Sequence, residues 1–372
     1  MVSEVLNTYD MESVTTVLMD INGGIGDVLC YYYNLVSDGY PYPDCFYKLK
    51  CFKTKYPRIK TILVSNGWNY RIVSDFLRFN PYVDLVMYKN NFLAKDLHTE
   101  RNSTNISSLL SARAVDRDTW ISNDFVNSSN VCLFPDIVRF LDDELESNVD
   151  HGVYISKEDY EGISKWEGQE YVIVHPFAAD KFRSCEYIDK IDGYNAYPDF
   201  HYAALCNLLG ETGYQVLLMG SESEDLPFDS MHSNVHNLAG EINIRQSVYL
   251  TERCEGLIGS NSAMSCVTFA TEIPTIVITP SYCLTRSDFG RLDNNMPEHV
   301  EKWGNMTDNP NKGPQIKKHL ESTKRSDFYV IYERPNYLYD LNPREIVEKF
   351  RKMTVSGDPH GNTPERMKLC EG

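Results

Sequence analysis

The residues best suited to catalysis lie in a glycine-rich turn near the start of the chain. Gly23, Gly24 and Gly26 fall within four positions, and Asp27 follows them at the start of a helix-like run. Glycines let the backbone approach a ligand closely and adopt a positive φ angle. A carboxylate here would repel a pyrophosphate, but it could take a proton from a hydroxyl group as a general base. The alternative is a capping aspartate in the first turn of the helix, where the helix dipole also stabilises it.

A second candidate loop carries cations. The apolar run 171–174 predicts a buried strand, and His175, Lys181 and Arg183 come after it. Lysine and arginine can offset the charge of a pyrophosphate through charge-assisted hydrogen bonds. The alternative is a solvated loop with two surface cations.

A third candidate loop follows the apolar run 215–219. Gly220 and Ser221 come next, and Glu222 and Glu224 supply carboxylates. A carboxylate just past a strand end can accept hydrogen bonds from both hydroxyl groups of a nucleotide ribose. An acidic loop exposed to solvent is the alternative.

A fourth candidate site is a helix start. After the short apolar run 256–258, the residues Asn261, Ser262, Ala263 and Met264 open a helix of small side chains. The free backbone N–H groups of a helix N-terminus bind phosphate oxygens, and the helix dipole assists. The same residues also fit an ordinary N-cap, because serine and asparagine are favoured there.

These loops can form one binding site only if the strands that precede them end side by side in the fold. Strands are expected at 14–19, 60–64 and 84–88, and helices at 26–36 and 70–79. The alternation restarts in the second half. Strands are expected there at 171–174, 215–219, 256–258 and 275–278, and helices at 200–209, 244–254, 262–271 and 343–353. Such alternation predicts parallel sheets with right-handed crossovers, which bind ligands at the carboxyl ends of their strands.

The length of 372 residues exceeds what one hydrophobic core usually serves, so two domains are expected. The acidic stretch 141–168 contains few apolar runs and marks the boundary. We therefore expect an N-terminal Rossmann-like domain at 1–160, a C-terminal Rossmann-like domain at 161–354 and a flexible tail at 355–372.

The composition excludes several classes of protein. A net charge of −17 argues against a protein whose main work is to grip nucleic acid, because phosphate contacts need lysine and arginine. The sequence shows no signal peptide and no apolar run long enough to cross a bilayer. The ten cysteines show no metal-type spacing, and we interpret them as free thiols of a cytoplasmic protein.

Taken together, the motifs resemble family nine glycosyltransferases, the heptosyltransferases of lipopolysaccharide assembly. The resemblance runs from about residue 14 to 282. It rests on the glycine turn at 23–29, an N-P-x-V-D phrase at 80–84, His175-Pro176 with Ala178 and Lys181, Gly220-Ser221-Glu222, the N-L-A-G phrase at 237–240, and the helix start at 261–266.

The resemblance implies a GT-B fold, in which two Rossmann-like doubly wound domains face a central cleft. It implies inverting, metal-independent transfer of a heptose or hexose-type sugar from a nucleotide sugar, with an ADP-sugar favoured and no cofactor. Asp27 would be the catalytic base, next to the acceptor-side glycines 23, 24 and 26. Lys181 would contact the donor phosphates, and Glu222 would hold the ribose. The acceptor would be a glycan or glycolipid, with peripheral membrane contact, and the protein a monomer.

Three departures from the family pattern bear on the donor and the acceptor. The family's Asp, Gly and His in the last motif are Asn261, Ala263 and Cys266 here. An insertion at about 180–195 leaves Arg183 or Lys190 as alternative phosphate-binding cations. The middle of the N-terminal domain lacks family-typical sequence, which leaves the acceptor open. The alternatives to a transferase are a sugar-nucleotide epimerase on the same scaffold and a relative that binds nucleotide or glycan without catalysis.

Overall fold

The computed structural model divides the chain into two compact units. Unit 1 comprises residues 1–156 and 368–372, and unit 2 comprises residues 157–367. The division falls four residues before the boundary expected at 160. The structure describes residues 13–22, 25–33, 45–66, 70–88, 114–115, 131–133, 152–176, 197–221, 226, 228–260, 262–280, 304–305, 328–333, 341–356 and 369–370.

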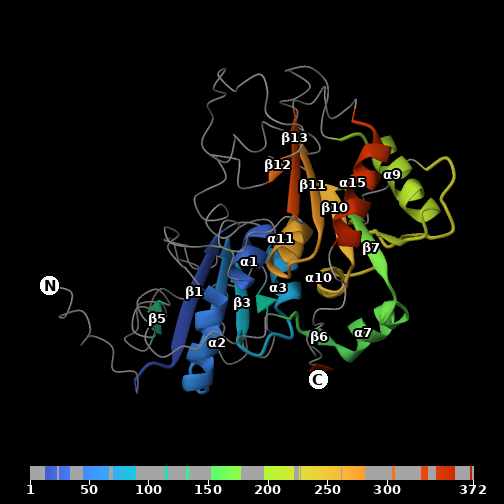
Figure 1. The fold of residues 1–372 in the computed structure, drawn as a ribbon. Helices are drawn as coiled ribbons and strands as arrows, with labels where there is room; N and C mark the ends of the chain where they lie inside the picture. Colours follow the sequence, from blue (N-terminus) through green and yellow to red (C-terminus); the bar gives the residue numbers. More distant parts are fainter. Residues whose placement is uncertain are drawn as a thin grey trace, which may run out of the picture. The chain divides into compact units, whose positions relative to one another are not determined.

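Unit 1 is built on a five-stranded parallel sheet with the strand order β4-β3-β2-β1-β5. The expected strands are present, and two short ones are added. The strands are β1 (Thr16–Asn22), β2 (Lys60–Asn66), β3 (Leu85–Tyr88), β4 (Ala114–Val115) and β5 (Val131–Leu133). Figure 1 shows β1, β2 and β3 running in the same direction.

Three helices accompany this sheet: α1 (Ile25–Tyr32), α2 (Cys45–Lys55) and α3 (Tyr70–Phe76). The expected helix at 26–36 is present but ends at Tyr32, and α2 has no counterpart among the expected helices. The Tyr32 ring joins all three helices. Its centroid lies 5.2 Å from that of Phe46 in α2 and 5.1 Å from that of Phe76 in α3. This aromatic contact fixes the helix that carries Asp27.

A short parallel strand pair also belongs to unit 1. Strand β6 (Ile155–Ser156) pairs with β14 (Leu369–Cys370) near the end of the chain. The pair lies partly in the segment expected to be a flexible tail. The helix before that segment, α15, runs to Ser356, three residues beyond the expected end of helix 343–353.

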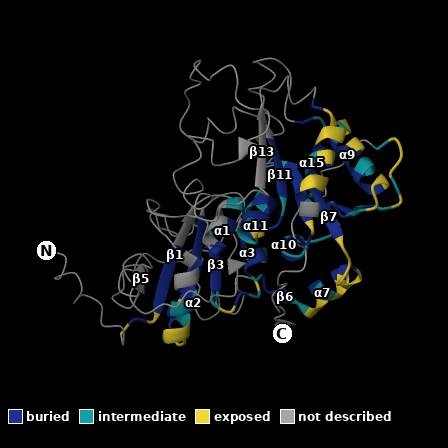
Figure 2. Cartoon of the chain, viewed as in Figure 1, coloured by how far each residue is buried: buried dark blue, intermediate teal, exposed yellow. Residues whose placement is uncertain are grey.

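Unit 2 contains a seven-stranded sheet with the order β12-β13-β11-β10-β7-β8-β9. All its pairings are parallel except β12 with β13. Its strands are β7 (Tyr171–His175), β8 (Gln215–Leu218), β9 (Val235–Asn237), β10 (Gly256–Ser260), β11 (Thr275–Pro280), β12 (Gly304–Asn305) and β13 (Phe328–Glu333). The central strands are buried on both faces, as Figure 2 shows by their dark blue colour.

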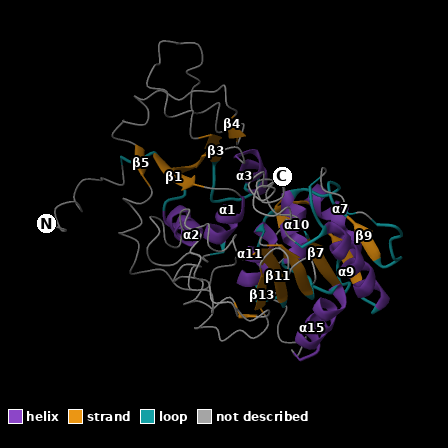
Figure 3. Ribbon diagram, turned by 90° about the horizontal axis from the view of Figure 1, so that it is seen from above, coloured by secondary structure: helices purple, strands orange, loops and turns teal. Residues whose placement is uncertain are grey.

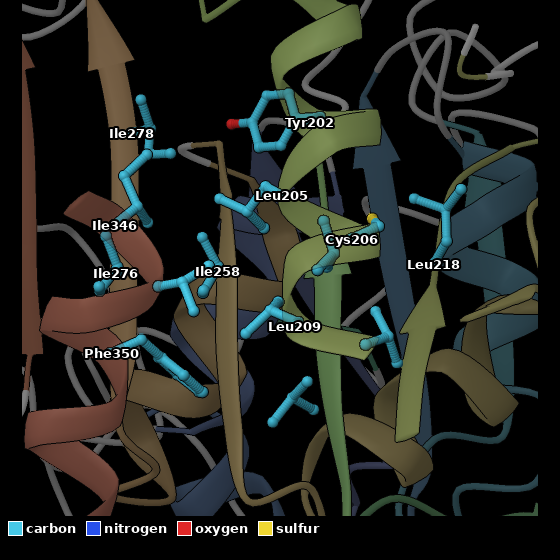
Figure 4. Close-up of a cluster of buried hydrophobic side chains, with 14 of the residues drawn as sticks. Tyr202, Leu205, Cys206, Leu209, Leu218, Ile258, Ile276, Ile278, Ile346 and Phe350 are labelled. Atoms are coloured by element: carbon cyan, nitrogen blue, oxygen red, sulfur yellow. The ribbon is translucent and has the colours of Figure 1, made fainter. Parts of the chain in front are cut away.

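Helices cover both faces of this sheet (Figure 3). The α9 helix (Asp199–Glu211) packs beside α15 (Pro343–Ser356), and both lie over Val172, Val174, Ile258 and Ile276 in one core cluster (Figure 4). The helices α10 (Ile244–Thr251) and α11 (Ala263–Ala270) contact each other on the other face. Unit 2 opens with α7 (Lys157–Ile163) and a 3₁₀ turn (Ser164–Trp166). The expected α/β class with parallel sheets is confirmed, and the placing of two domains around a cleft stays a prediction.

Candidate functional site

The strand order of unit 2 identifies where a ligand would bind. From β7 the chain moves outward through β8 to β9, and it then returns to the other side of β7 to form β10, β11 and β13. The order therefore reverses between β7 and β10. Open α/β sheets bind ligands at the carboxyl ends of the strands that flank such a reversal.

Four of the expected donor-site residues lie at this point. His175 is the last residue of β7, and Ser262 is the N-cap residue of α11, which follows β10. Ala263 and Met264 are the first two residues of that helix. Asn261, Lys181, Arg183 and Lys190 lie outside the described residues.

Buried polar atoms without a hydrogen-bond partner are concentrated at the carboxyl edges of the two sheets. Among the described residues these atoms are Ser65 Oγ, His175 Nδ1, Tyr197 Oη, Tyr202 Oη, Ser260 Oγ and Ser262 Oγ. Five belong to unit 2, where they end β7, end β10 or begin α9 and α11. Leaving a buried polar group unpaired costs about 1–3 kcal/mol. Such groups therefore mark a place where a missing water or ligand would bind.

The five atoms of unit 2 divide between the two faces of its sheet. Side chains alternate along a strand, so His175 points away from the face of Val174 and toward the α11 face. Ser260 follows Ile258 by two positions and shares its face, which α9 covers. Tyr197 lies two residues before α9 and Tyr202 lies in its first turn, and both are on that same face.

His175 is uncharged at neutral pH. Burial lowers the pKa of its imidazole from 6.5 to about 4, and Nδ1 has no solvent contact. The ring can therefore give or accept one hydrogen bond, but it adds no positive charge for a diphosphate. At this edge of unit 2, positive potential comes from the N-terminus of α11.

The first turn of α11 is held by one serine. Ser265 Oγ accepts a hydrogen bond from the Ser262 N–H at 3.3 Å and donates one to the Ser262 carbonyl at 2.6 Å. Cys266 Sγ donates weakly to the same carbonyl at 3.7 Å. The family's histidine is therefore replaced here by a thiol that faces its own helix backbone.

The N-L-A-G phrase supports the loop expected to hold a ribose. The Gly240 N–H donates to the Gly220 carbonyl at 3.0 Å, and the Leu238 N–H donates to the Leu218 carbonyl at 2.8 Å. Gly240 has a φ of 74°, which favours glycine. Gly220 and Ser221 come one residue after the end of β8, and Glu222 lies outside the described residues. The phrase thus fixes the backbone that leads into Glu222.

Unit 1 has a comparable reversal beside β1. Its chain moves from β1 through β2 and β3 to β4, and β5 then pairs on the other side of β1. The glycine turn follows β1 directly, and Gly26 and Asp27 are the second and third residues of α1. Gly23 and Gly24 lie outside the described residues. Asp27 is therefore in the first turn of a helix beside the reversal point.

The N-P-x-V-D phrase has a structural role. Asp84 accepts hydrogen bonds from Lys53 Nζ and, at 2.9 Å, from the Thr61 N–H, and Asn80 accepts one from the Tyr82 N–H. These bonds connect the end of α2 with the starts of β2 and β3. The phrase lies at the amino edge of its sheet and takes no part in the site.

Sequence reasoning missed Ser65 and the hydroxyls of Tyr197 and Tyr202. It placed Ser260 at the helix start before Asn261 but did not count it among the donor contacts. The tyrosine hydroxyls gave no signal, since buried aromatic residues are usually interpreted as core.

Among the described residues no group of three or more His, Cys, Asp or Glu side chains could hold a metal ion. In that same part of the chain, none of the helices is both long and apolar enough to span a membrane.

Comparisons with known proteins find a family match within unit 2. Residues 194–289 match the model of glycosyltransferase family 9 (heptosyltransferase). Lipopolysaccharide heptosyltransferase 2 of Salmonella typhimurium is 29% identical over 90 residues, which cover 22% of this chain and 26% of that protein. The match thus spans about a quarter of the relative's length.

Solved structures show a weaker likeness over more of the chain. The E. coli ADP-heptose heptosyltransferase II is 13% identical, with 91% of this chain and 98% of that chain covered and a TM-score of 0.45. The E. coli heptosyltransferase WaaC with ADP is 12% identical, with 91% and 99% covered and a TM-score of 0.41. A family 9 glycosyltransferase of Veillonella parvula is 11% identical, with 92% and 98% covered and a TM-score of 0.42.

The matched segment begins just before α9 and ends after β11, so it contains four of the five unpartnered atoms of unit 2. The expected resemblance is confirmed: through residues 194–289 this chain is similar to glycosyltransferase family 9, the heptosyltransferase family.

Proposed function

We propose that this protein is an inverting glycosyltransferase that moves a heptose or hexose-type sugar from a nucleotide-diphosphate donor to a hydroxyl group of a glycan or glycolipid. The observation that carries the proposal is the set of unpartnered polar atoms at the carboxyl edge of unit 2, most of them inside the family 9 segment. An ADP-linked heptose is the first donor to test, because the matched family is that of the heptosyltransferases.

In the proposed reaction the acceptor oxygen attacks the anomeric carbon from the face opposite the nucleotide. A new C–O bond forms as the bond to the nucleotide diphosphate breaks, which inverts the configuration. Asp27 takes the proton of the acceptor hydroxyl. Unit 1 contributes this base from the first turn of α1.

The departing diphosphate gains negative charge, which must be stabilised without a metal ion. Lys181 or Arg183 would supply the cation, and the N-terminus of α11 would supply backbone N–H groups. Preorganised donors of this kind contribute much of the rate enhancement in many enzymes. Glu222 would hold the ribose, next to the loop that Gly240 supports.

A thermal-shift series tests the proposal. The purified protein is heated with ADP, ADP-heptose, ADP-glucose, UDP-glucose and GDP-mannose in turn, with and without EDTA. A ligand at one hundred times its dissociation constant stabilises the folded state by about 2.7 kcal/mol. We expect a shift with an ADP-linked sugar that EDTA leaves unchanged. The absence of a shift with every nucleotide sugar would refute the proposal, and conversion of the donor to an epimer without acceptor would favour the epimerase.

A further inference from the structure

Among the described residues, three unpartnered hydroxyl groups lie on the α9 face of the unit 2 sheet: Tyr197, Tyr202 and Ser260. The two tyrosine rings meet edge to face, with centroids 4.9 Å apart. Figure 4 shows the Tyr202 hydroxyl pointing away from α9 toward the strand that carries Ile258. Ser260 ends that strand on the same face.

These hydroxyls make no hydrogen bond within the described part of the chain, although both tyrosine rings belong to the core cluster on this face. Tyr197 and Tyr202 are only 2% and 1% exposed, yet neither oxygen has a partner among the described residues. Buried Tyr171 provides the contrast, because its hydroxyl donates to the Leu250 carbonyl at 2.9 Å. A hydroxyl that is buried and unpaired destabilises the protein unless a ligand or water completes it.

The chemistry of the three hydroxyls indicates which kind of ligand group could hydrogen-bond to them. Burial raises the pKa of both phenols, so all three hydroxyls are neutral at physiological pH. Each can both donate and accept a hydrogen bond. A diphosphate is better matched by the helix N-terminus on the other face, where N–H groups point outward. Neutral groups of mixed character match alcohol groups, which also donate and accept.

We propose that Ser260, Tyr197 and Tyr202 form a subsite that binds a hydroxyl group of the donor, from either its ribose or its transferred sugar. Ser260 is the most exposed of the three and forms the entrance, while the two phenols lie deeper. The inference rests on the proposed function and adds to it a substrate contact on the α9 face.

The test measures two quantities for Tyr202→Phe and Ser260→Ala: the melting temperature of the ligand-free protein, and the dissociation constants of ADP and ADP-heptose. Because the described residues make no hydrogen bond to either hydroxyl, we expect an unchanged or higher melting temperature in both variants. Because a ligand contact is lost, both should bind ADP-heptose about two- to tenfold more weakly. Equal weakening for ADP assigns the ribose, and weakening for ADP-heptose alone assigns the transferred sugar.

Two control variants separate this result from a structural effect. Tyr171→Phe removes a satisfied hydroxyl, so its melting temperature should fall by about 2–4 °C while donor binding stays unchanged. Ser65→Ala removes an unpartnered hydroxyl from unit 1 and should leave donor binding unchanged.

The inference is wrong if both test variants bind the two nucleotides as wild type does, or if Tyr202→Phe loses as much stability as Tyr171→Phe. If wild type binds neither nucleotide, the proposed function falls and this inference falls with it. If wild type binds the nucleotides and both variants bind them equally well, the subsite is refuted and the proposed function stands.

Discussion

Gly259 in β10 lies directly opposite His175 in β7, at the point where the strand order of unit 2 reverses. A Cβ atom at position 259 would lie 2.3 Å from the His175 carbonyl oxygen. Real Cβ atoms essentially never approach another atom so closely, so the two strands can meet here only if residue 259 is glycine. The contact fixes the backbone of His175 and thereby the edge at which the donor is proposed to bind.

Gly259→Ala should therefore both destabilise the protein and weaken donor binding. Overpacking a filled site costs about 1–3 kcal/mol, and the atom that must move here belongs to the backbone. Chemical denaturation measures the first effect and calorimetric titration with ADP-heptose the second. Gly162→Ala is the matched control, because its Cβ would meet only the end of the Gln246 side chain, at 2.7 Å. Equal stability of the two variants would contradict the prediction.

A buried ion pair holds α7 against α10. Arg245 Nε lies 2.8 Å from Asp159 Oδ2, and the two side chains are 5% and 9% exposed. Asn243, the N-cap residue of α10, donates to Asp159 Oδ1 at 2.6 Å. Asp159→Ala removes the carboxylate that pairs with the buried guanidinium of Arg245 and should cost about 3–5 kcal/mol in denaturant unfolding.

The pair offers its own controls within α7. Lys157 and Glu161 form an exposed pair at 3.7 Å, so Lys157→Ala should change the free energy of unfolding by less than about 1 kcal/mol. Replacing both buried partners together, as Asp159→Leu with Arg245→Met, should cost less than the sum of the two single changes. Additive losses would mean that the two charges do not interact.

The sequence predicted those elements of the fold that leave a local residue pattern. Strands such as β1 and β7 are continuous apolar runs, and Asn243 with Gln246 forms a capping box whose residue types are visible in the sequence. The short strands β4 and β5 were missed because two or three residues carry no periodicity. Their pairing depends on β3 and β1, which are distant in the chain.

The site was predicted only where a motif follows a strand. His175 and Ser262 were singled out in this way, since a strand end followed by a polar residue is visible in the sequence. Their role in donor binding stays a prediction. The hydroxyls of Tyr197 and Tyr202 were not singled out, because an unpaired buried oxygen is a property of the packing around it. No residue pattern in the sequence distinguishes these tyrosines from Tyr171 in β7, whose hydroxyl is hydrogen-bonded.

Asp84 should make the stability of the protein depend on acid pH. Burial alone would raise the pKa of its carboxyl group, but hydrogen bonds from Lys53 and the Thr61 backbone lower it below the ordinary value of 3.8. The unfolded chain then binds the proton more readily than the folded protein. The stabilisation is therefore complete above the unfolded pKa and is lost as pH falls through the folded pKa.

The measurement compares wild type with Asp84→Asn from pH 7 down to pH 3. The difference in the free energy of unfolding should stay constant above about pH 5 and shrink below it. A difference that does not vary with pH would show that the carboxylate has the same pKa in the folded and the unfolded chain.

Glu222 should bind the donor before and during the reaction alike. Removing such uniform binding raises the KM for the donor and leaves kcat largely unchanged. Hydrogen bonds to charged groups contribute about 1.5–3 kcal/mol, so Glu222→Ala should raise the KM by roughly tenfold to a hundredfold. Glu224→Ala is the control, because only Glu222 fits the G-x-E phrase. A defect in the Glu224 variant alone would shift the assignment by two residues.

Asp27→Asn should abolish most transfer while leaving donor affinity nearly unchanged. Asp27 lies in the first turn of α1, beside the strand reversal of unit 1, whereas the proposed donor contacts belong to unit 2. A general base typically contributes on the order of 10² to 10⁴ in rate, and an amide of the same shape takes no proton. Product formation measures the transfer rate, and titration with ADP-heptose measures the donor affinity. The control is Glu158→Gln, because Glu158 is an exposed acid in the first turn of α7. Losing its interaction with the helix dipole should lower stability by about 0.3–1 kcal/mol and leave turnover unchanged. Wild-type turnover by the Asp27→Asn variant, with only a small change in melting temperature, would assign Asp27 to helix capping and leave the reaction without its base.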